Sequence, residues 1–147
     1  MNAKAHALIG AGAGSLTGWT LAIKANREPT LPEICGWIVG GIGGAKLPDL
    51  LEPAYCPRHR KFCHSGCVLA IDLAFLQSQM LENWIQALHD KADEHRARSL
   101  SDPENALIYC LSAILCEFLA GVLPALFGGY ASHLLADSTT PCGIPII

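Results

Sequence analysis

Two short stretches of the chain contain residues that could bind a metal ion. In "GGYASHLLADSTTP", His133 and Asp137 are four residues apart on a predicted helix, so both side chains lie on one helical face. A neutral imidazole and a carboxylate suit zinc or a similar divalent ion. The alternative is an ordinary hydrogen bond on a solvated face, but this segment is otherwise apolar, where an unpaired carboxylate is costly. The pair therefore indicates a candidate metal site.

The second stretch, "HRKFCHS", begins at His59. His59 and His64 are five residues apart, so they do not share a helical face; a helix starting near Lys61 would carry His64 in its first turn and leave His59 in a loop. Arg60 could bind an anion, because a guanidinium matches phosphate oxygens bidentately. Alternatively, the basic residues Arg58 and Lys61 mark the cytoplasmic end of an apolar helix.

Cysteines flank the same stretch, which raises the alternative of a structural zinc site on Cys56, Cys63 and Cys67. Their spacing lacks the paired CxxC of a zinc knuckle, so this alternative is the weaker one. The seven cysteines are an odd number, and no cleavable signal peptide is recognisable. We therefore expect reduced thiols.

Four further ionisable residues stand in apolar or loop segments: His6, Asp49, Glu52 and Asp72. An ionisable group within an apolar helix, such as Asp72 in "CVLAIDLAFL", is a functional candidate. The alternative is a hydrogen bond to a neighbouring helix, and a lone histidine such as His6 is more often structural.

Apolar helices must position these residues. Residues 5–23 carry Gly10, Gly14 and Gly18 at four-residue spacing, which permits close helix packing. Residues 34–48 form a second apolar segment, too short for an ordinary bilayer span, and 49–59 is expected to be a loop because two prolines interrupt it. A long helix is expected from Phe62 to about Arg98.

The sequence "SDPEN" has the residues of a helix start and precedes the apolar stretch 106–136. We expect Pro124 to divide this stretch into two helices. No segment favours a strand. The sequence thus predicts an all-α protein, a single metal-binding domain over residues 1–147 with four to six helices.

The composition lies between that of a soluble helical protein and a membrane protein. Hydrophobic residues make up 51% of the chain and charged residues 16%, against roughly 25% charged in an average soluble domain. The apolar stretches 5–23 and 106–131 favour membrane association; a soluble bundle with an apolar core is the alternative. The net charge of −3 argues against a nucleic-acid scaffold.

The order of the motifs is more specific than any one of them: His6, then "GAKLPDLLEP", "HRKFCHS" and "GYASHLLADSTTPCGIP". This order resembles the YdjM-type family of proposed membrane-bound, metal-dependent hydrolases, which is distantly similar to zinc-dependent phospholipase C and zinc nucleases. The resemblance implies an all-α fold in which several helices hold a divalent metal, with these ligands: His6, Asp49, His64, His133 and Asp137.

The resemblance also implies what the remaining motif residues do. His59, Arg60 and Ser65 match its "HR" and "HS" positions, whereas Leu50 and Leu51 replace the acidic residue and histidine that many members carry after "PD". We expect zinc, with manganese as the alternative, to activate water that attacks a phosphoester substrate, which could be a small molecule or a lipid. Arg60 would hold the anion, His59 would assist, and Asp49 or Glu52 would be a ligand or general base.

These expectations place an enzyme at the inner membrane of a bacterium, with a soluble cytoplasmic protein as the alternative. A second hypothesis is a non-catalytic membrane or interaction protein whose metal is structural.

Overall fold

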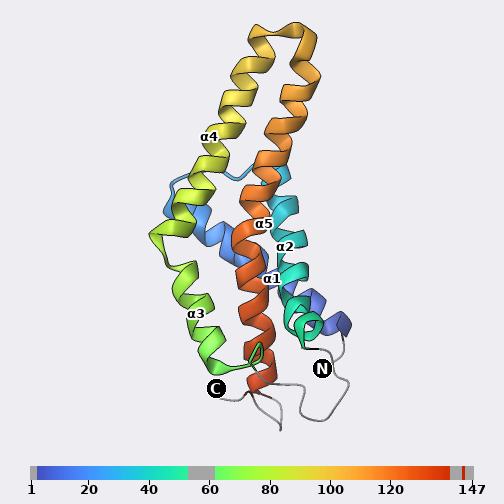
Figure 1. Cartoon of the computed structure of the whole chain (residues 1–147), viewed down its shortest axis with the longest axis vertical. Helices are drawn as coiled ribbons and strands as arrows, with labels where there is room; N and C mark the ends of the chain where they lie inside the picture. The colour runs from blue at the N-terminus through green and yellow to red at the C-terminus, as the bar shows by residue number, and fades with distance from the viewer. Residues whose placement is uncertain (1–2, 53–61, 140–143, 145–147) are drawn as a thin grey trace.

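The computed structural model describes residues 3–52, 62–139 and 144, and within these ranges it is helical without strands. The prediction of an all-α bundle is confirmed. The elements, shown in Figure 1, are α1 (Ala3–Lys24), α2 (Leu31–Leu51), α3 (Gly66–Leu76), α4 (Gln79–Ser101), the 3₁₀ turn η1 (Pro103–Asn105) and α5 (Ala106–Ser138).

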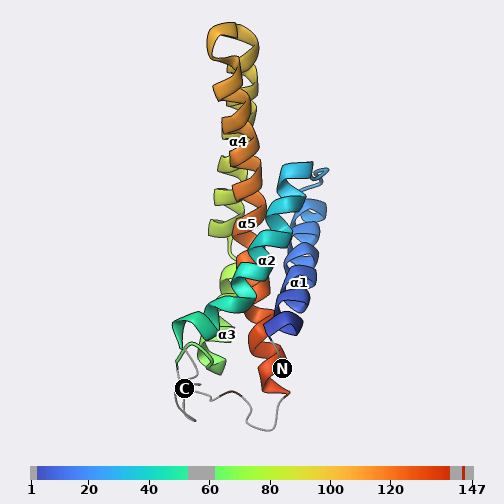
Figure 2. The ribbon, with the colours of Figure 1, turned by 90° about the vertical axis from the view of Figure 1, so that its right-hand side faces the viewer.

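Helix α5 is the centre of the bundle, because each of the other four α-helices packs against it. Its 33 residues span about 50 Å. Its first half pairs with α4 in a hairpin that projects beyond α1 and α2, and its second half is covered by α1, α2 and α3 (Figures 1 and 2). The prediction that Pro124 divides this segment was wrong: Pro124 lies buried inside one continuous helix. Its burial among the packed helices outweighs the cost of its missing hydrogen bond.

Glycines bring α1 and α2 into backbone contact, as the four-residue spacing predicts. A Cβ atom added at Gly10 would lie 2.5 Å from the carbonyl oxygen of Gly41, and one at Gly14 would lie 2.6 Å from the Gly41 Cα. Both distances are below van der Waals contact. Only glycine therefore permits this approach.

A second row of glycines, which the sequence analysis did not single out, brings α2 equally close to α5. A Cβ atom at Gly36, Gly40 or Gly44 would lie 2.2, 2.5 or 1.9 Å from a carbonyl oxygen of α5. Helix α2 thus approaches both α1 and α5 through glycines, and because α1 also packs against α5, the three helices pack against one another.

Two features of the helix boundaries differ from the predicted ones. Helix α2 continues through Pro48 to Leu51, so Asp49 lies on a helix rather than in a loop. The expected helix from Phe62 to Arg98 is two helices, because Ser78 caps a new one: its Oγ accepts a hydrogen bond from the backbone N–H of Leu81 at 3.3 Å.

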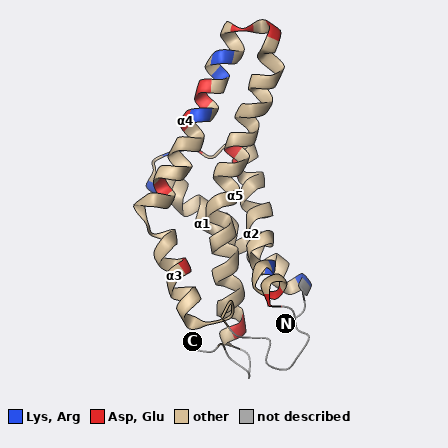
Figure 3. Ribbon diagram, viewed as in Figure 1, with Lys and Arg blue, Asp and Glu red and all other residues tan. Residues whose placement is uncertain are grey.

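Ionic contacts join α4 to the rest of the bundle. Glu82 pairs with Lys24 of α1, His89 approaches Glu33 of α2 at 3.4 Å, and Arg96 pairs with Glu117 of α5. Figure 3 shows mixed positive and negative residues along α4, whereas α5 is almost free of charge. Helix α4 is therefore anchored by charge as well as by apolar contacts.

Among the described residues, one stretch, Pro103–Ser138, is long and apolar enough to cross a bilayer. Core helices of soluble proteins can also reach this length and hydropathy. Its best window has a mean hydropathy of 2.2, and 22% of that window is buried inside the molecule. Helix α1, the other stretch expected to favour a membrane, falls short of that measure, because glycine and threonine dilute its apolar residues.

Candidate metal centre

The five residues predicted as metal ligands converge at one end of the bundle, where α5 terminates. His133 and Asp137 come from the last turns of α5, His6 from the start of α1, Asp49 from the end of α2, and His64 from the turn before α3. All except Asp49 are buried. Four separate segments thus deliver two carboxylates and three imidazoles to one place.

Four of these side chains lie close to one another. The Nε2 atom of His133 lies 3.5 Å from Asp137 Oδ2 and 3.6 Å from Asp49 Oδ1. The Nε2 atom of His64 lies 3.5 Å from Asp49 Oδ1 and 3.9 Å from Asp137 Oδ2. These separations exceed a hydrogen bond. They resemble the roughly 3.4 Å between two ligands of a tetrahedral zinc, each about 2.1 Å from the ion.

The environment of His133 fixes which of its nitrogens can bind a metal. Its Nδ1 atom lies 2.7 Å from the carbonyl oxygen of Ala45, which can only accept, so the ring proton is on Nδ1. Its Nε2 atom is buried and has no hydrogen-bond partner among the described residues. A buried nitrogen lone pair that faces two carboxylates is unfavourable unless a cation lies between them.

His64 is oriented by a carboxylate. Its Nδ1 atom lies 3.1 Å from Glu52 Oε2, so the Nδ1–H group donates to Glu52 and the Nε2 atom is turned toward Asp49 and Asp137. Carboxylates hold metal-binding histidines in this way in many proteins. The sequence left Glu52 open as a ligand or general base, and this contact favours an orienting role.

The turn that carries His64 is held on both sides. Tyr130 of α5 donates its hydroxyl hydrogen bond to the Cys63 carbonyl at 2.7 Å. Ser65 caps α3, because its Oγ accepts a hydrogen bond from the backbone N–H of Val68 at 3.3 Å. His64 therefore lies just before the helix rather than in its first turn, and Ser65 of the "HS" motif has a structural role.

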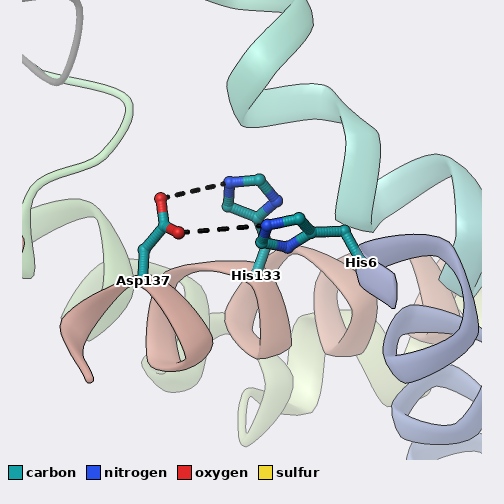
Figure 4. Close-up of side chains that lie close together, drawn as sticks. All are labelled: His6, His133 and Asp137. Carbon is teal, nitrogen blue, oxygen red and sulfur yellow. Dashed lines mark ion pairs between the residues drawn. The ribbon is translucent and has the colours of Figure 1, made fainter. Parts of the chain in front are cut away.

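His6 approaches the other oxygen of Asp137. Its ring stacks on His133 with centroids 4.2 Å apart, and its Nε2 atom lies 4.0 Å from Asp137 Oδ1 (Figure 4). The residues that could hold an ion form two groups, His6–His133–Asp137 and Asp49–His64–His133, which share His133. Since only one nitrogen of His133 is available, the two groups describe a single centre.

His59, Arg60 and Cys56 lie outside the described residues. Cys63 and Cys67 belong to neither group, so the described part of the chain does not form the thiol zinc site considered from the sequence. Asp72 is buried on α3 and also belongs to neither group.

A second buried cluster escaped the sequence analysis. Glu33 accepts two hydrogen bonds of 2.8 Å from the Arg27 guanidinium and lies 3.4 Å from His89 Nε2. Burial alone would raise the pKa of Glu33, but Arg27 and His89 outweigh it and hold the pKa near 2. The signal available was Thr30 three residues earlier, which predicts a capping box but not the partner Arg27.

Comparisons with known proteins identify the family to which the chain belongs. Searches of curated proteins and of solved structures found no match to this chain. A family model described as YdjM inner membrane protein matches residues 1–147. Because the match spans the whole sequence, the chain belongs to the YdjM inner membrane protein family.

Proposed function

We propose that this protein is a metal-dependent hydrolase that acts on phosphoester bonds at the inner membrane. The observation that carries the proposal is the buried Nε2 atom of His133, which faces the carboxylates of Asp49 and Asp137 without a hydrogen-bond partner among the described residues. Two carboxylates with neutral imidazoles suit a divalent cation, zinc first and manganese second.

A divalent ion at this centre would supply Lewis-acid activation of water and of a phosphoryl oxygen. The chain itself would hold the ion with His64, His133, Asp49 and Asp137. Asp49 has a side chain 55% exposed, whereas those of the other three are almost completely buried. Substrate would therefore approach from the side of Asp49, at the end of α2, and Arg60 and His59 remain our candidates for contacts with its phosphate.

One observation favours a structural metal as the second candidate function. Four possible protein ligands lie close together. Structural zinc sites are closed by four ligands, whereas catalytic sites keep one position for water. The exposure of Asp49 supports the catalytic alternative, because this carboxylate can leave its position to water most easily.

Elemental analysis of the untagged full chain, combined with hydrolysis assays, tests both candidates. The assays use a generic phosphodiester, a phosphomonoester and a phospholipid. We expect about one metal ion per chain, and turnover that disappears in Asp137→Asn but persists in the control Asp93→Asn, on the exposed face of α4. Metal without turnover would support the structural alternative, and a protein without metal would exclude both.

A further inference from the structure

A cavity of about 480 Å³ lies beside the candidate centre, between α3 and α5. Its volume is typical of a site for a small molecule. Most of its wall is apolar and comes from four helices, through side chains that include Leu47, Val68, Phe75, Trp84, Leu126 and Phe127. We call this cavity the α3–α5 pocket.

Asp72 is the one carboxylate in the wall of the α3–α5 pocket that the structure describes. The residue is 7% exposed, and its Oδ2 atom is buried with no hydrogen-bond partner in the described part of the chain. Burial raises the pKa of Asp72 to about 7. A buried carboxyl oxygen without a partner is costly. It indicates a ligand that brings a hydrogen-bond donor into an otherwise apolar space.

The α3–α5 pocket adjoins the candidate centre through its wall. Tyr130 lines the pocket and donates its hydroxyl hydrogen bond to the Cys63 carbonyl, next to His64. Leu47 precedes Asp49 by two residues on α2. A molecule in the pocket would therefore have one end close to the metal ligands.

The other end of the pocket is open on the outside of the bundle. Ile71 and Trp84 both line the pocket, and they are 66% and 48% exposed. Exposed apolar side chains at the mouth of an apolar cavity suit entry from a bilayer rather than from water. Membership of an inner membrane protein family agrees with such an entry.

We propose that the α3–α5 pocket binds the hydrocarbon chain of a long-chain phosphoester whose phosphate lies at the metal centre, with Asp72 hydrogen-bonded to a hydroxyl or amine of the same molecule. This inference rests on the proposed function and names the substrate class of that site. It assigns chain binding to α3 and α5, and donor recognition to Asp72.

Photochemical labelling of the full chain in phosphatidylcholine nanodiscs tests this inference. The probes are dodecyl phosphate, dodecanol and dodecylamine, each with a diazirine at the end of its chain. We expect labelled peptides to cluster on residues 68–75 and 126–130, because the pocket holds the chain end there. Leu8 and Leu16, exposed apolar residues of α1, report background labelling from the bilayer.

Variants that fill the pocket provide the decisive comparison. Val68→Phe, inside the pocket, is expected to lower labelling of both segments about tenfold, the effect of losing roughly 1.4 kcal/mol of binding. Val39→Phe is the matched control, because Val39 is 53% exposed and lies outside the pocket wall. Ile71→Trp, at the exposed mouth, repeats the test without altering the interior. Labelling spread equally over α1 and α3, or unchanged in both pocket variants, would overturn the inference.

The choice of probe allows the role of Asp72 and the role of the metal centre to be tested separately. Asp72→Leu should reduce labelling by the dodecylamine probe about tenfold, the value of a charge-assisted hydrogen bond; unchanged amine labelling would refute the assignment to Asp72. The dodecanol probe carries no phosphate, so its labelling should persist after chelation. Pocket labelling in a protein without metal or turnover would therefore preserve chain binding and reject only the proposed hydrolase.

Discussion

Helix α2 has a buried cluster of histidine and carboxylate at each of its ends, and the two clusters are built differently. At its start, Arg27 satisfies Glu33 with two hydrogen bonds of 2.8 Å. At its end, the Nε2 atom of His133 is no closer than 3.5 Å to the carboxylate oxygens of Asp49 and Asp137. The first cluster contains its own cation, whereas the second brings lone pairs and negative charges together.

This difference separates a structural ion pair from a candidate binding site. A buried carboxylate with a guanidinium partner needs nothing from outside the chain, because the two groups neutralise each other. A buried nitrogen that faces two carboxylates remains unfavourable until a cation binds between them. Burial and residue type alone do not distinguish the clusters, since both contain histidine and carboxylate; the sign of the neighbouring charges and the distances do.

The largest difference should appear when metal is removed. In wild type, a chelator should lower the unfolding temperature strongly, because binding to the folded state stabilises it; at a metal concentration 1,000 times the dissociation constant the gain is about 4 kcal/mol. In His133→Ala, the chelator should have no effect. Thermal denaturation with and without chelator measures this. His95→Ala on α4 should respond like wild type, and an equal chelator response in His133→Ala would contradict the centre described here.

Breaking the other cluster should cost stability without affecting metal. Arg27→Ala leaves Glu33 buried and charged, with His89 as its remaining partner, and should lower the free energy of unfolding by about 3 kcal/mol. Denaturant titration gives the stability and elemental analysis the metal content. A loss of metal comparable to that of His133→Ala would show that the two clusters are not independent.

The Glu33 cluster also predicts an acid dependence. The folded pKa of Glu33 is about 2, below the value of about 4.3 expected in the unfolded chain. The stabilisation from Glu33 is therefore complete above the unfolded pKa and is lost as the pH falls from about 4.3 to about 2. Denaturation of chelator-treated protein across this range should show a flatter dependence in Arg27→Ala than in wild type. Parallel curves would rule out this role for Arg27.

A smaller effect is expected at Glu52, which contacts His64 rather than facing the centre. Glu52→Gln keeps the size of the side chain but weakens the interaction that orients His64, and should lower metal affinity about 10- to 100-fold. Competition with a chelator of known affinity measures the change. Glu104→Gln on the exposed turn η1 is the control. Complete loss of metal in Glu52→Gln would instead indicate direct ligation by Glu52.

The smallest effect distinguishes two serine caps of the same kind. Ser65→Ala and Ser78→Ala each remove an N-cap and should lower the free energy of unfolding by about 1 kcal/mol. Because Ser65 follows His64, only Ser65→Ala should also weaken metal binding. Equal affinities in the two variants would mean that the Tyr130 hydrogen bond alone holds the turn.

Contacts within one helix could be predicted from the sequence more readily than contacts between helices. The four-residue spacing of His133 and Asp137 placed both on one face, and the spacing of Gly10, Gly14 and Gly18 indicated close packing. The partners of Glu33 and Glu52 were not predictable, because spatial neighbours of this kind depend on how the chain folds back. The other three proposed ligands, His6, Asp49 and His64, came from motif resemblance rather than from spacing.

The predicted helix boundaries were wrong at two places, and each error has a local reason. The break at Ser78 lies in "LQSQM", which contains no proline or glycine, so only the serine cap marks it. At Pro124 the error was the opposite one: a break was predicted where the helix continues, because a proline usually ends a helix. Here α5 packs against helices on several sides, and tertiary contacts outweigh the local preference.

The glycine contacts determine the position of the candidate centre, because they set how closely the backbones of α2 and α5 approach each other. A side chain at Gly44 would meet the Leu126 carbonyl at 1.9 Å and force α2 away from α5. Because Ala45, whose carbonyl holds His133, is the next residue, the same displacement would release His133. Gly44, which has no side chain, is thus coupled to the candidate centre through the backbone, and we expect its substitution to disturb the centre as the loss of a ligand would.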